Sequence, residues 1–408
     1  MTEFDGVVEN INPRKIKSVK REETLKIVKF VNEGMCLAYD ADSKPVFVRY
    51  VLPGELVRVN IYREHKDYAI AEPLEILEAS ASRIEPQCAY FSLCGGCDYQ
   101  MLDYDTQLEV KKALAIDTFK SIGKMEDVEI TDVIKSDPCY NYRNTETFKV
   151  GMRYKSIGFF RKDSRFVVDI EECKIAMNGI NKALNAVRNG DYPKHNFKVR
   201  TTLDGDTVIN WIKVDGYRDS EVYETVSAAG LSIKYKISKD SFFQVNDYVI
   251  PLWIEKIISF LDKNKNERIF DLYCGIGLIT LFVGHFSSET IGVELSKSSI
   301  KDALHNLEIN GGASNVKFIE SAVEEVVDKL GRADVVIIDP PRKGIDQKTL
   351  DSILDISPKK IIYSSCKHQT MARDISLLSN DYKIKELALV DMFPQTRHLE
   401  LLALLVKK

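Results

Sequence analysis

The stretch Arg268-Ile-Phe-Asp-Leu-Tyr-Cys-Gly-Ile-Gly277 predicts the fold of the C-terminal part of the chain. Its first half is typical of a buried strand, and it runs directly into two glycines and a helical segment. Strand-like runs alternate with helical segments after it, which indicates βαβ units and a mostly parallel sheet. These runs are Thr290–Glu294, Val316–Glu320, Ala333–Ile338 and Lys360–Ser365, followed by Lys383–Val390 and Leu399–Val406. A short connection separates the last two, so we expect one of them to enter the sheet antiparallel.

The glycine-rich turn of this stretch is a candidate cofactor site. In an open α/β sheet the ligand lies beyond the carboxyl ends of the strands, where Gly275 and Gly277 let the backbone approach it. A dinucleotide fingerprint would need a third glycine where Thr280 stands, and Asp271 would repel a pyrophosphate. S-adenosylmethionine carries an ammonium and a sulfonium but no phosphate, so the acidic neighbourhood suits it better. Glu294 ends the next strand, where a carboxylate can accept both ribose hydroxyls; a tight turn with a solvated acid is the alternative.

The segment Asp339-Pro-Pro-Arg342 is a second candidate pocket loop. Its prolines fix φ and hold the loop rigid where the fourth strand meets the pocket. The loop is similar to the Asn/Asp-Pro-Pro-aromatic loop of amine-directed methyltransferases, but an arginine replaces the aromatic residue. The stacking face used over a flat amine is therefore missing, and a forked donor for carbonyl oxygens takes its place. This argues against N-methylation.

Two residues near the C-terminus fit methylation of a pyrimidine carbon. C5 of a pyrimidine is a poor nucleophile, so a thiolate must first add at C6, and a base must later remove the C5 proton. Cys366, at the end of a strand-like run, is the candidate nucleophile, and Glu400 is the candidate base. We expect the neighbouring Lys367 and His368 to lower the pKa of the thiol. The alternatives are a buried structural thiol and a surface acid.

Together these segments resemble the RNA uracil-5-methyltransferases, which make 5-methyluridine in tRNA and large-subunit rRNA. The matching motifs span most of the chain: Ser241-Phe-Phe-Gln-Val-Asn246, Asp271–Gly277, Gly292–Glu294, Asp339–Arg342, Ser364–Cys366 and Phe393-Pro-Gln-Thr-Arg-His-Leu-Glu400. The resemblance implies that Gln244, Tyr273, Glu294 and Asp339 line the S-adenosylmethionine site, with Cys366 as nucleophile and Glu400 as base. The chain departs from the family at Lys367-His368, where Asn or Asp and then Pro are usual, and at Leu278, where asparagine is usual.

Three cysteines, Cys88, Cys94 and Cys97, lie on one short glycine-containing loop. With a fourth thiol they suit either tetrahedral zinc or an iron–sulfur cube, and their spacing does not choose between these. The resemblance implies a [4Fe-4S] cluster with Cys173 as the distant ligand, and Cys139 is the other candidate. The spacing excludes the Cys-x3-Cys-x2-Cys loop of radical S-adenosylmethionine enzymes.

The 408 residues predict two or three domains, and we expect four segments. These are a basic N-terminal arm (1–21), an OB-like β-barrel (22–79) that looks like a TRAM domain, a central α+β domain (80–228) with the cluster and a helix near Thr106–Ile122, and a Rossmann-like methyltransferase domain (229–408). We expect about five strands in the barrel, with β-rich runs at Leu25–Val31, Val46–Val51, Glu55–Tyr62 and Tyr68–Ile76. No apolar run is long enough to span a bilayer, and no signal core opens the chain, which favours the cytoplasm. We expect neither a membrane nor DNA as partner and favour a monomer.

The net charge of −4 means that RNA must be bound through local basic patches. Residues 149–165 combine cations and aromatic rings in this way, although the charged outer face of a strand gives the same pattern. A duplex hides C5 and C6, so we expect a uridine flipped out of a loop. The leading hypothesis is formation of 5-methyluridine in 23S rRNA. The alternatives are the T-loop of tRNA and an RNA-binding or folding factor with a degenerate active site. A cytosine-C5 enzyme is disfavoured because the only Pro-Cys pair, Pro138-Cys139, lies outside the cofactor domain.

Overall fold

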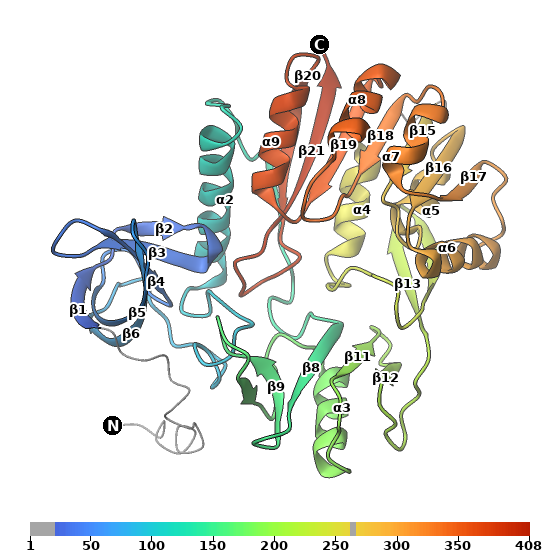
Figure 1. Ribbon diagram of the computed structural model, residues 1–408. Helices are drawn as coiled ribbons and strands as arrows, with labels where there is room; N and C mark the ends of the chain where they lie inside the picture. Colours follow the sequence, from blue (N-terminus) through green and yellow to red (C-terminus); the bar gives the residue numbers. More distant parts are fainter. Residues whose placement is uncertain (1–20, 262–266) are drawn as a thin grey trace. The chain divides into compact units, whose positions relative to one another are not determined.

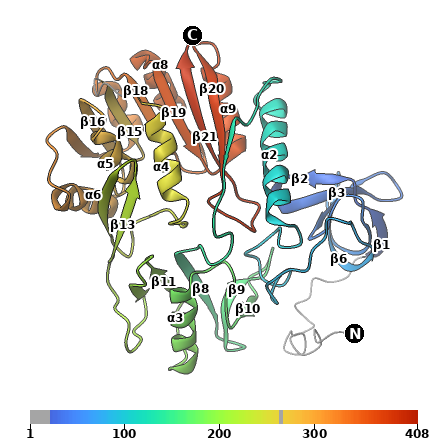
Figure 2. The ribbon, with the colours of Figure 1, turned by 180° about the vertical axis from the view of Figure 1, so that it is seen from behind.

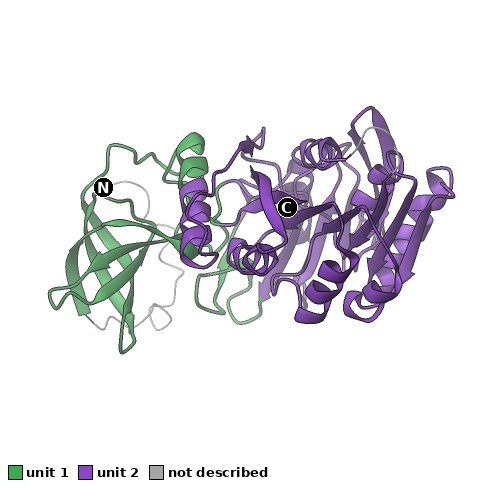
Figure 3. Ribbon diagram, turned by 90° about the horizontal axis from the view of Figure 1, so that it is seen from above, with its two compact units in different colours: residues 1–110, 151–170, 395–397 green, residues 111–150, 171–394, 398–408 purple. Residues whose placement is uncertain are grey.

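The computed structural model describes residues 21–261 and 267–408, which divide into two compact units. Unit 1 is residues 1–110, 151–170 and 395–397; unit 2 is residues 111–150, 171–394 and 398–408 (Figure 3). The basic arm predicted for residues 1–21 lies outside the described residues, except for Arg21.

Among the described residues of unit 1, six strands form one sheet in the order β1-β5-β6-β4-β3-β2 (Figure 1, blue). Alternate residues of β5 (Val57, Val59 and Ile61) are buried in a common apolar core, as a half-buried strand requires. The strands are β1 (Arg21–Lys26), β2 (Lys29–Val31), β3 (Met35–Tyr39), β4 (Pro45–Arg49), β5 (Leu56–Glu64) and β6 (Ala69–Glu78). The sequence predicted about five strands here and missed β3.

The elements that follow β6 in the chain, up to residue 237, are a mixture of helices and strands. The helix predicted near Thr106 is α2 (Tyr104–Ser121). The others are β7 (Asp132–Ile134), β8 (Thr145–Gly151), β9 (Ser156–Phe160), β10 (Val167–Asp169), α3 (Asn178–Asn189), β11 (Phe197–Thr201), β12 (Thr207–Asn210), β13 (Val222–Ala228) and β14 (Leu231–Ile237).

In the described part of unit 2, eight strands form one sheet in the order β17-β16-β15-β18-β19-β21-β20-β7. The strands after β14 are β15 (Arg268–Leu272), β16 (Glu289–Glu294), β17 (Val316–Glu320), β18 (Val335–Ile338), β19 (Lys360–Ser365), β20 (Tyr382–Val390) and β21 (Glu400–Lys407). β15 to β19 pair in parallel, whereas β21 is antiparallel to both β19 and β20. The predicted parallel sheet and its one antiparallel strand are confirmed.

Helices pack on this sheet, with α4 on one face and α8 and α9 on the other (Figures 1 and 2). The helices of this part are α4 (Ile250–Ser259), α5 (Leu278–Gly284), α6 (Lys297–Ile309), α7 (Val323–Val326), α8 (Gln347–Ile356) and α9 (His368–Leu378). Both faces are covered, which explains why β18 (Val-Val-Ile-Ile) is apolar and buried along its whole length. None of the helices in the described residues is long and apolar enough to cross a membrane.

A fully buried ion pair in unit 2 joins α2 to the segment that follows β20. Lys111 Nζ of α2 lies 2.6 Å from Asp391 Oδ1, and both side chains have no solvent exposure. Lys111 also donates to the Phe393 carbonyl at 3.0 Å. Burying a charge destabilises the folded state unless the charge is paired and hydrogen-bonded. Removing either Lys111 or Asp391 would therefore leave the other as an uncompensated buried charge.

We predict that Lys111→Met destabilises the protein by about 3–5 kcal/mol, because Asp391 is left buried without its cation. Urea unfolding followed by circular dichroism measures this change. Adding Asp391→Leu should restore much of the loss, and Lys120→Met, an exposed position of the same helix, is the control. An equal effect of Lys120→Met would contradict the prediction.

Candidate active site

The candidate reaction centre lies inside unit 2, at the carboxyl ends of its central strands. β15 pairs with β16 on one side and with β18 on the other, so the strand order reverses beside β15. Ligands of open α/β sheets bind in the crevice at such a reversal. Asp271 lies near the end of β15, Asp339 follows β18, and Cys366 follows β19. These two acids and this thiol, all selected from the sequence, therefore lie at one edge of the sheet.

The turn after β15 requires glycine at position 277. Gly277 has a φ of +82°, and a Cβ there would lie 2.7 Å from the ring of Phe318. The same turn orients the predicted ribose-binding acid, because the Gly275 N–H donates to Glu294 Oε2 at 3.1 Å. Ser296 N–H donates to the other oxygen at 2.7 Å. Glu294 is thus held at the turn by two backbone donors.

Carboxylates crowd this edge of the sheet. Desolvation raises the pKa of the buried Asp271 to about 7; a hydrogen bond from Thr280 opposes the rise, and the charge of Glu294 adds to it. Desolvation and the charge of Asp271 likewise raise the pKa of Asp339 to about 7. Thr280 donates to Asp271 Oδ2, but Oδ1 has no hydrogen-bond partner among the described residues. Thr280, which stands where a dinucleotide fingerprint would need glycine, is therefore a hydrogen-bond partner of Asp271. The grouped acids at this edge attract a cation.

The register of β19 and β21 brings the predicted nucleophile and base together. Ser364 is opposite Leu402 and Ser365 is opposite Leu401, so one further step of this antiparallel register sets Cys366 opposite Glu400. Glu400 is buried, and Ser364 Oγ donates to its Oε1 at 2.7 Å. Desolvation and then the charge of Asp339 raise the pKa of Glu400 well above its ordinary value, whereas the bond from Ser364 lowers it.

The thiol of Cys366 is half-buried, and its pKa is raised by desolvation and by the charges of Glu400 and Asp339. The guanidinium of Arg342 opposes this rise through its charge and a hydrogen bond. We expected Lys367 and His368 to supply that cation; the structure gives this role to Arg342, on the loop after β18. The sequence indicates Arg342 only as a donor to substrate carbonyls, because its contact with Cys366 depends on β18 and β19 being neighbours in the sheet.

Gln244 and Tyr273 are held at defined positions near the same sheet. Asn144 Nδ2 donates to the Gln244 carbonyl at 2.9 Å, and the Gln244 side chain has no hydrogen bond within the described residues. Tyr273 has a φ of +65°, which is uncommon for a residue with a side chain and marks strain beside the glycine turn. Desolvation raises its pKa to about 12, and a hydrogen bond with Thr349 of α8 opposes the rise. The roles of both residues toward a cofactor stay predictions.

Residues 395–397, inside the C-terminal motif, group with unit 1. The Gln395 carbonyl accepts from Asp98 N–H at 2.9 Å and from Tyr99 N–H at 3.1 Å. Gln107 makes two further hydrogen bonds with Gln395. Its Nε2 donates to the side-chain Oε1 of Gln395 at 2.9 Å, and its Oε1 accepts from the backbone N–H of Gln395 at 3.0 Å. Arg397 N–H donates to Asp98 Oδ2 at 3.1 Å. This segment is therefore anchored beside the cysteine loop, which the sequence did not indicate.

Cys88, Cys94 and Cys97 lie in unit 1, and Cys173 lies in unit 2. Desolvation raises the pKa of Cys97, a bond with Gln100 lowers it, and the charges of Cys94 and Cys88 raise it further, so these three thiols are near one another. The described residues contain no group of three or more His, Cys, Asp or Glu side chains with the geometry of a metal site. A cluster held by Cys88, Cys94, Cys97 and Cys173 therefore stays a prediction.

Part of the basic stretch 149–165 is engaged within unit 1. Arg161 Nη2 lies 3.0 Å from Glu72 Oε2, and Lys162 Nζ lies 2.8 Å from Asp98 Oδ1. These two cations bind carboxylates of their own chain, so they are less available to phosphates than the sequence indicated. Tyr154 and Phe160 remain exposed.

The chain is similar to several known proteins. The family described as tRNA (Uracil-5-)-methyltransferase matches residues 213–408. An RNA methyltransferase of Thermotoga maritima is 30% identical over 94% of this chain and 99% of its own, and one of Aquifex aeolicus is 32% identical over 90% and 94%. The structure of Pyrococcus abyssi tRNA (uracil-54, C5)-methyltransferase in complex with S-adenosyl-L-homocysteine has a TM-score of 0.73 at 23% identity, covering 94% of this chain and 100% of that one.

The solved structure confirms the predicted α/β methyltransferase fold. The two relatives match almost the whole chain, and the family model covers the segment that carries Asp271, Asp339, Cys366 and Glu400. The chain belongs to the family of RNA (uracil-5-)-methyltransferases.

Proposed function

We propose that this enzyme transfers a methyl group from S-adenosylmethionine to C5 of a uridine in 23S rRNA. The observation that carries the chemistry is the register of β19 and β21, which sets Cys366 opposite Glu400 at the acidic edge of the sheet. A structural thiol would need neither a buried acid opposite it nor a cation beside it. Cys366 has both, in Glu400 and Arg342.

In the proposed reaction Cys366 acts first. Its thiolate adds to C6 of uracil, and the electrons of the C5–C6 double bond move into an enolate. S-adenosylmethionine supplies the methyl group to C5 from its sulfonium and leaves as S-adenosylhomocysteine. Glu400 then takes the C5 proton, the double bond re-forms, and the C6–sulfur bond breaks to release Cys366. The raised pKa of Glu400 makes its ionised form a stronger base, and Arg342 favours the thiolate.

The acidic edge fits a cationic cofactor. Asp271 Oδ1 is buried without a hydrogen-bond partner, and the pKa values of Asp271 and Asp339 are both raised to about 7. A bound cation would relieve this repulsion. Gln244, Tyr273, Glu294 and Asp339 are the proposed contacts. The S-adenosyl-L-homocysteine bound to the Pyrococcus abyssi protein supports S-adenosylmethionine as the cofactor.

The choice of RNA rests on the cysteine loop. The resemblance links the pattern of Cys88, Cys94 and Cys97 to the rRNA-modifying members of the family, which favours 23S rRNA. A tRNA T-loop is the second candidate, because the structurally similar archaeal protein is a tRNA (uracil-54, C5)-methyltransferase. The relatives favour an enzyme over a non-catalytic RNA-binding factor. A TRAM-like barrel in residues 22–79, a central domain in residues 80–228 and a cytoplasmic location complete the proposal.

A [4Fe-4S] cluster is part of the proposal. The charges of Cys94 and Cys88 raise the pKa of Cys97, which fits three thiols gathered around a shared group. The Gly96 N–H lies 3.4 Å from Cys94 Sγ, as a donor to a thiolate would. Thiols without a bound metal need not adopt the metal-bound arrangement, so the gathering of three thiols carries this part of the proposal. Cys173 is the proposed fourth ligand.

We predict that RNA containing 5-fluorouridine forms a covalent complex with the enzyme in the presence of S-adenosylmethionine. With fluorine at C5 there is no proton for Glu400 to remove, so elimination is blocked and the bond between Cys366 and C6 persists. The covalent complex is then visible as a shifted band on a denaturing gel. Cys366→Ala should form no complex, and Cys139→Ala should form it normally. Glu400→Gln should accumulate the complex even with ordinary uridine. A complex that survives Cys366→Ala would exclude Cys366 as the nucleophile.

We predict that S-adenosylmethionine binds more weakly as the pH falls below about 7. Asp271 and Asp339 have pKa values raised to about 7, and a cation favours their ionised forms, so binding must displace protons at lower pH. The loss should reach about tenfold per pH unit for each linked proton. Calorimetry in buffers of different ionisation enthalpy measures the released proton. Affinity that is constant between about pH 6 and about pH 8 would show that these acids do not face the cofactor.

We predict that anaerobically purified protein contains iron and labile sulfide in equal amounts. Cys94→Ser should reduce both to background, because three remaining thiols hold a cube poorly. Cys173→Ala should have the same effect and Cys139→Ala none, if Cys173 is the fourth ligand. Zinc without sulfide in the purified protein would instead indicate a tetrahedral zinc site.

A further inference from the structure

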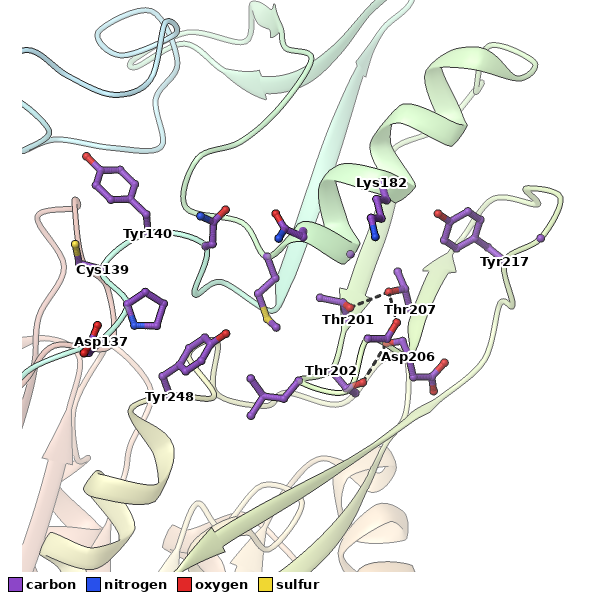
Figure 4. A pocket seen from close by; sticks show the side chains of 18 residues that line it. Asp137, Cys139, Tyr140, Lys182, Thr201, Thr202, Asp206, Thr207, Tyr217 and Tyr248 are labelled. Carbon is purple, nitrogen blue, oxygen red and sulfur yellow. Dashed lines mark hydrogen bonds between the residues drawn. The ribbon is translucent and has the colours of Figure 1, made fainter.

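A cavity of about 860 Å³ lies in unit 2, and none of the residues that line it belongs to the candidate reaction centre (Figure 4). Its walls come from three segments: residues 137–141, the start of α3, and the hairpin of β11 and β12. Tyr217 and Tyr248 complete the lining. The cavity is large enough for one or two nucleotides.

One side of the cavity carries an available cation. Lys182 of α3 is exposed and forms no ion pair or hydrogen bond with the described residues. Figure 4 shows it on the same side as Thr201, Thr207 and Tyr217. The hydroxyls of Thr201 and Thr207 are 2.8 Å apart, and α3 approaches them at Gly179, where a Cβ would lie 2.3 Å from Thr201 Oγ1. A cation beside hydroxyl groups suits a phosphate.

The cavity also presents exposed apolar and aromatic faces. Leu203 is 46% exposed and Tyr248 is 36% exposed, although both line a concave surface. Tyr217 is partly exposed, and its hydroxyl has no hydrogen bond to a described residue. Large side chains left open in this way mark contact surfaces, and tyrosine faces stack on unpaired bases.

The acidic residues of the lining do not oppose a phosphate beside Lys182. Asp206 is neutralised by Arg218, whose Nη2 lies 2.5 Å from its Oδ1. Asp137 lies with Tyr140 and Tyr248 on the other side of the cavity (Figure 4). The charge of the cavity is therefore divided, with the unpaired cation at one end and an acid that can accept hydrogen bonds at the other.

We propose that this cavity binds one or two unpaired nucleotides of the RNA substrate, away from the uridine that reacts. Lys182 holds a phosphate, and the tyrosine faces hold the bases. The inference rests on the proposed function, because it takes the bound RNA to be single-stranded around the target. It adds a recognition site outside the reaction centre, which would contribute to the choice of RNA.

The test compares binding of an unmodified 23S rRNA transcript to the wild type and to Lys182→Glu, Tyr217→Ala and Lys301→Glu. Lys301 is an exposed lysine of α6 outside the cavity and serves as the matched charge control. Filter binding over a salt series should show at least about tenfold weaker binding for Lys182→Glu, with a salt slope reduced by about one. Tyr217→Ala should lose about fivefold or more with an unchanged slope. Lys301→Glu should resemble the wild type.

Alkylation of Cys139 by N-ethylmaleimide gives a second readout, because this partly exposed cysteine lines the cavity. The transcript should slow alkylation in the wild type and in Lys301→Glu but not in Lys182→Glu. Lys182→Glu and Lys301→Glu that bind equally, or a Cys139 that RNA does not protect, would overturn the proposal. Mass spectrometry of the same RNA separates the two hypotheses: 5-methyluridine with no effect of Lys182→Glu rejects the cavity alone, whereas a Lys182 effect without 5-methyluridine supports the cavity and rejects the proposed function.

Discussion

The reaction centre depends on carboxylates that are kept close together in a poorly solvated place. Asp271, Asp339 and Glu400 influence one another, and their pKa values are all raised. Thr280 and Ser364 each donate one hydrogen bond, which offsets only part of the cost of burying these charges. Such an arrangement lowers the stability of the fold unless a cation binds. Buried acids with strongly raised pKa values are therefore more typical of a functional site than of a purely structural region.

The sheet explains why these acids meet. β15, β18 and β19 are parallel neighbours, so the residues that follow them lie at one edge. β21 runs the opposite way, so its first residue, Glu400, lies at the same edge where β19 ends. A slip of one residue between β19 and β21 would turn Glu400 to the other face of the sheet. The alignment of the proposed base and nucleophile is therefore set by strand register.

Much of this unit could be predicted from local patterns. The β15, β17 and β19 boundaries agree with the predicted runs, because apolar strands between turns and helices leave a clear signal. The thiol, the base and the acidic turn were found because each stands beside a strand end. β3 was missed because its five residues lie close behind another short strand, with only the turn at Asn32–Gly34 between them.

Contacts between distant segments could not be predicted. Arg342 beside Cys366, Lys111 against Asp391 and Gln395 against Gln107 join residues whose proximity follows from the fold and not from any local pattern. The cavity beside Lys182 is of the same kind, since its walls come from three separate segments. Local patterns therefore selected candidate residues at strand ends but not the neighbours that the fold brings to them.

The central claim is tested most directly by methyl transfer from labelled S-adenosylmethionine to unmodified 23S rRNA and tRNA transcripts in parallel, with the product nucleoside mapped by mass spectrometry. The account predicts 5-methyluridine at one or a few positions of 23S rRNA, and none with Cys366→Ala. Label in tRNA alone would contradict the choice of RNA. A labelled nucleoside other than 5-methyluridine, or no label in either RNA, would contradict the proposed chemistry itself.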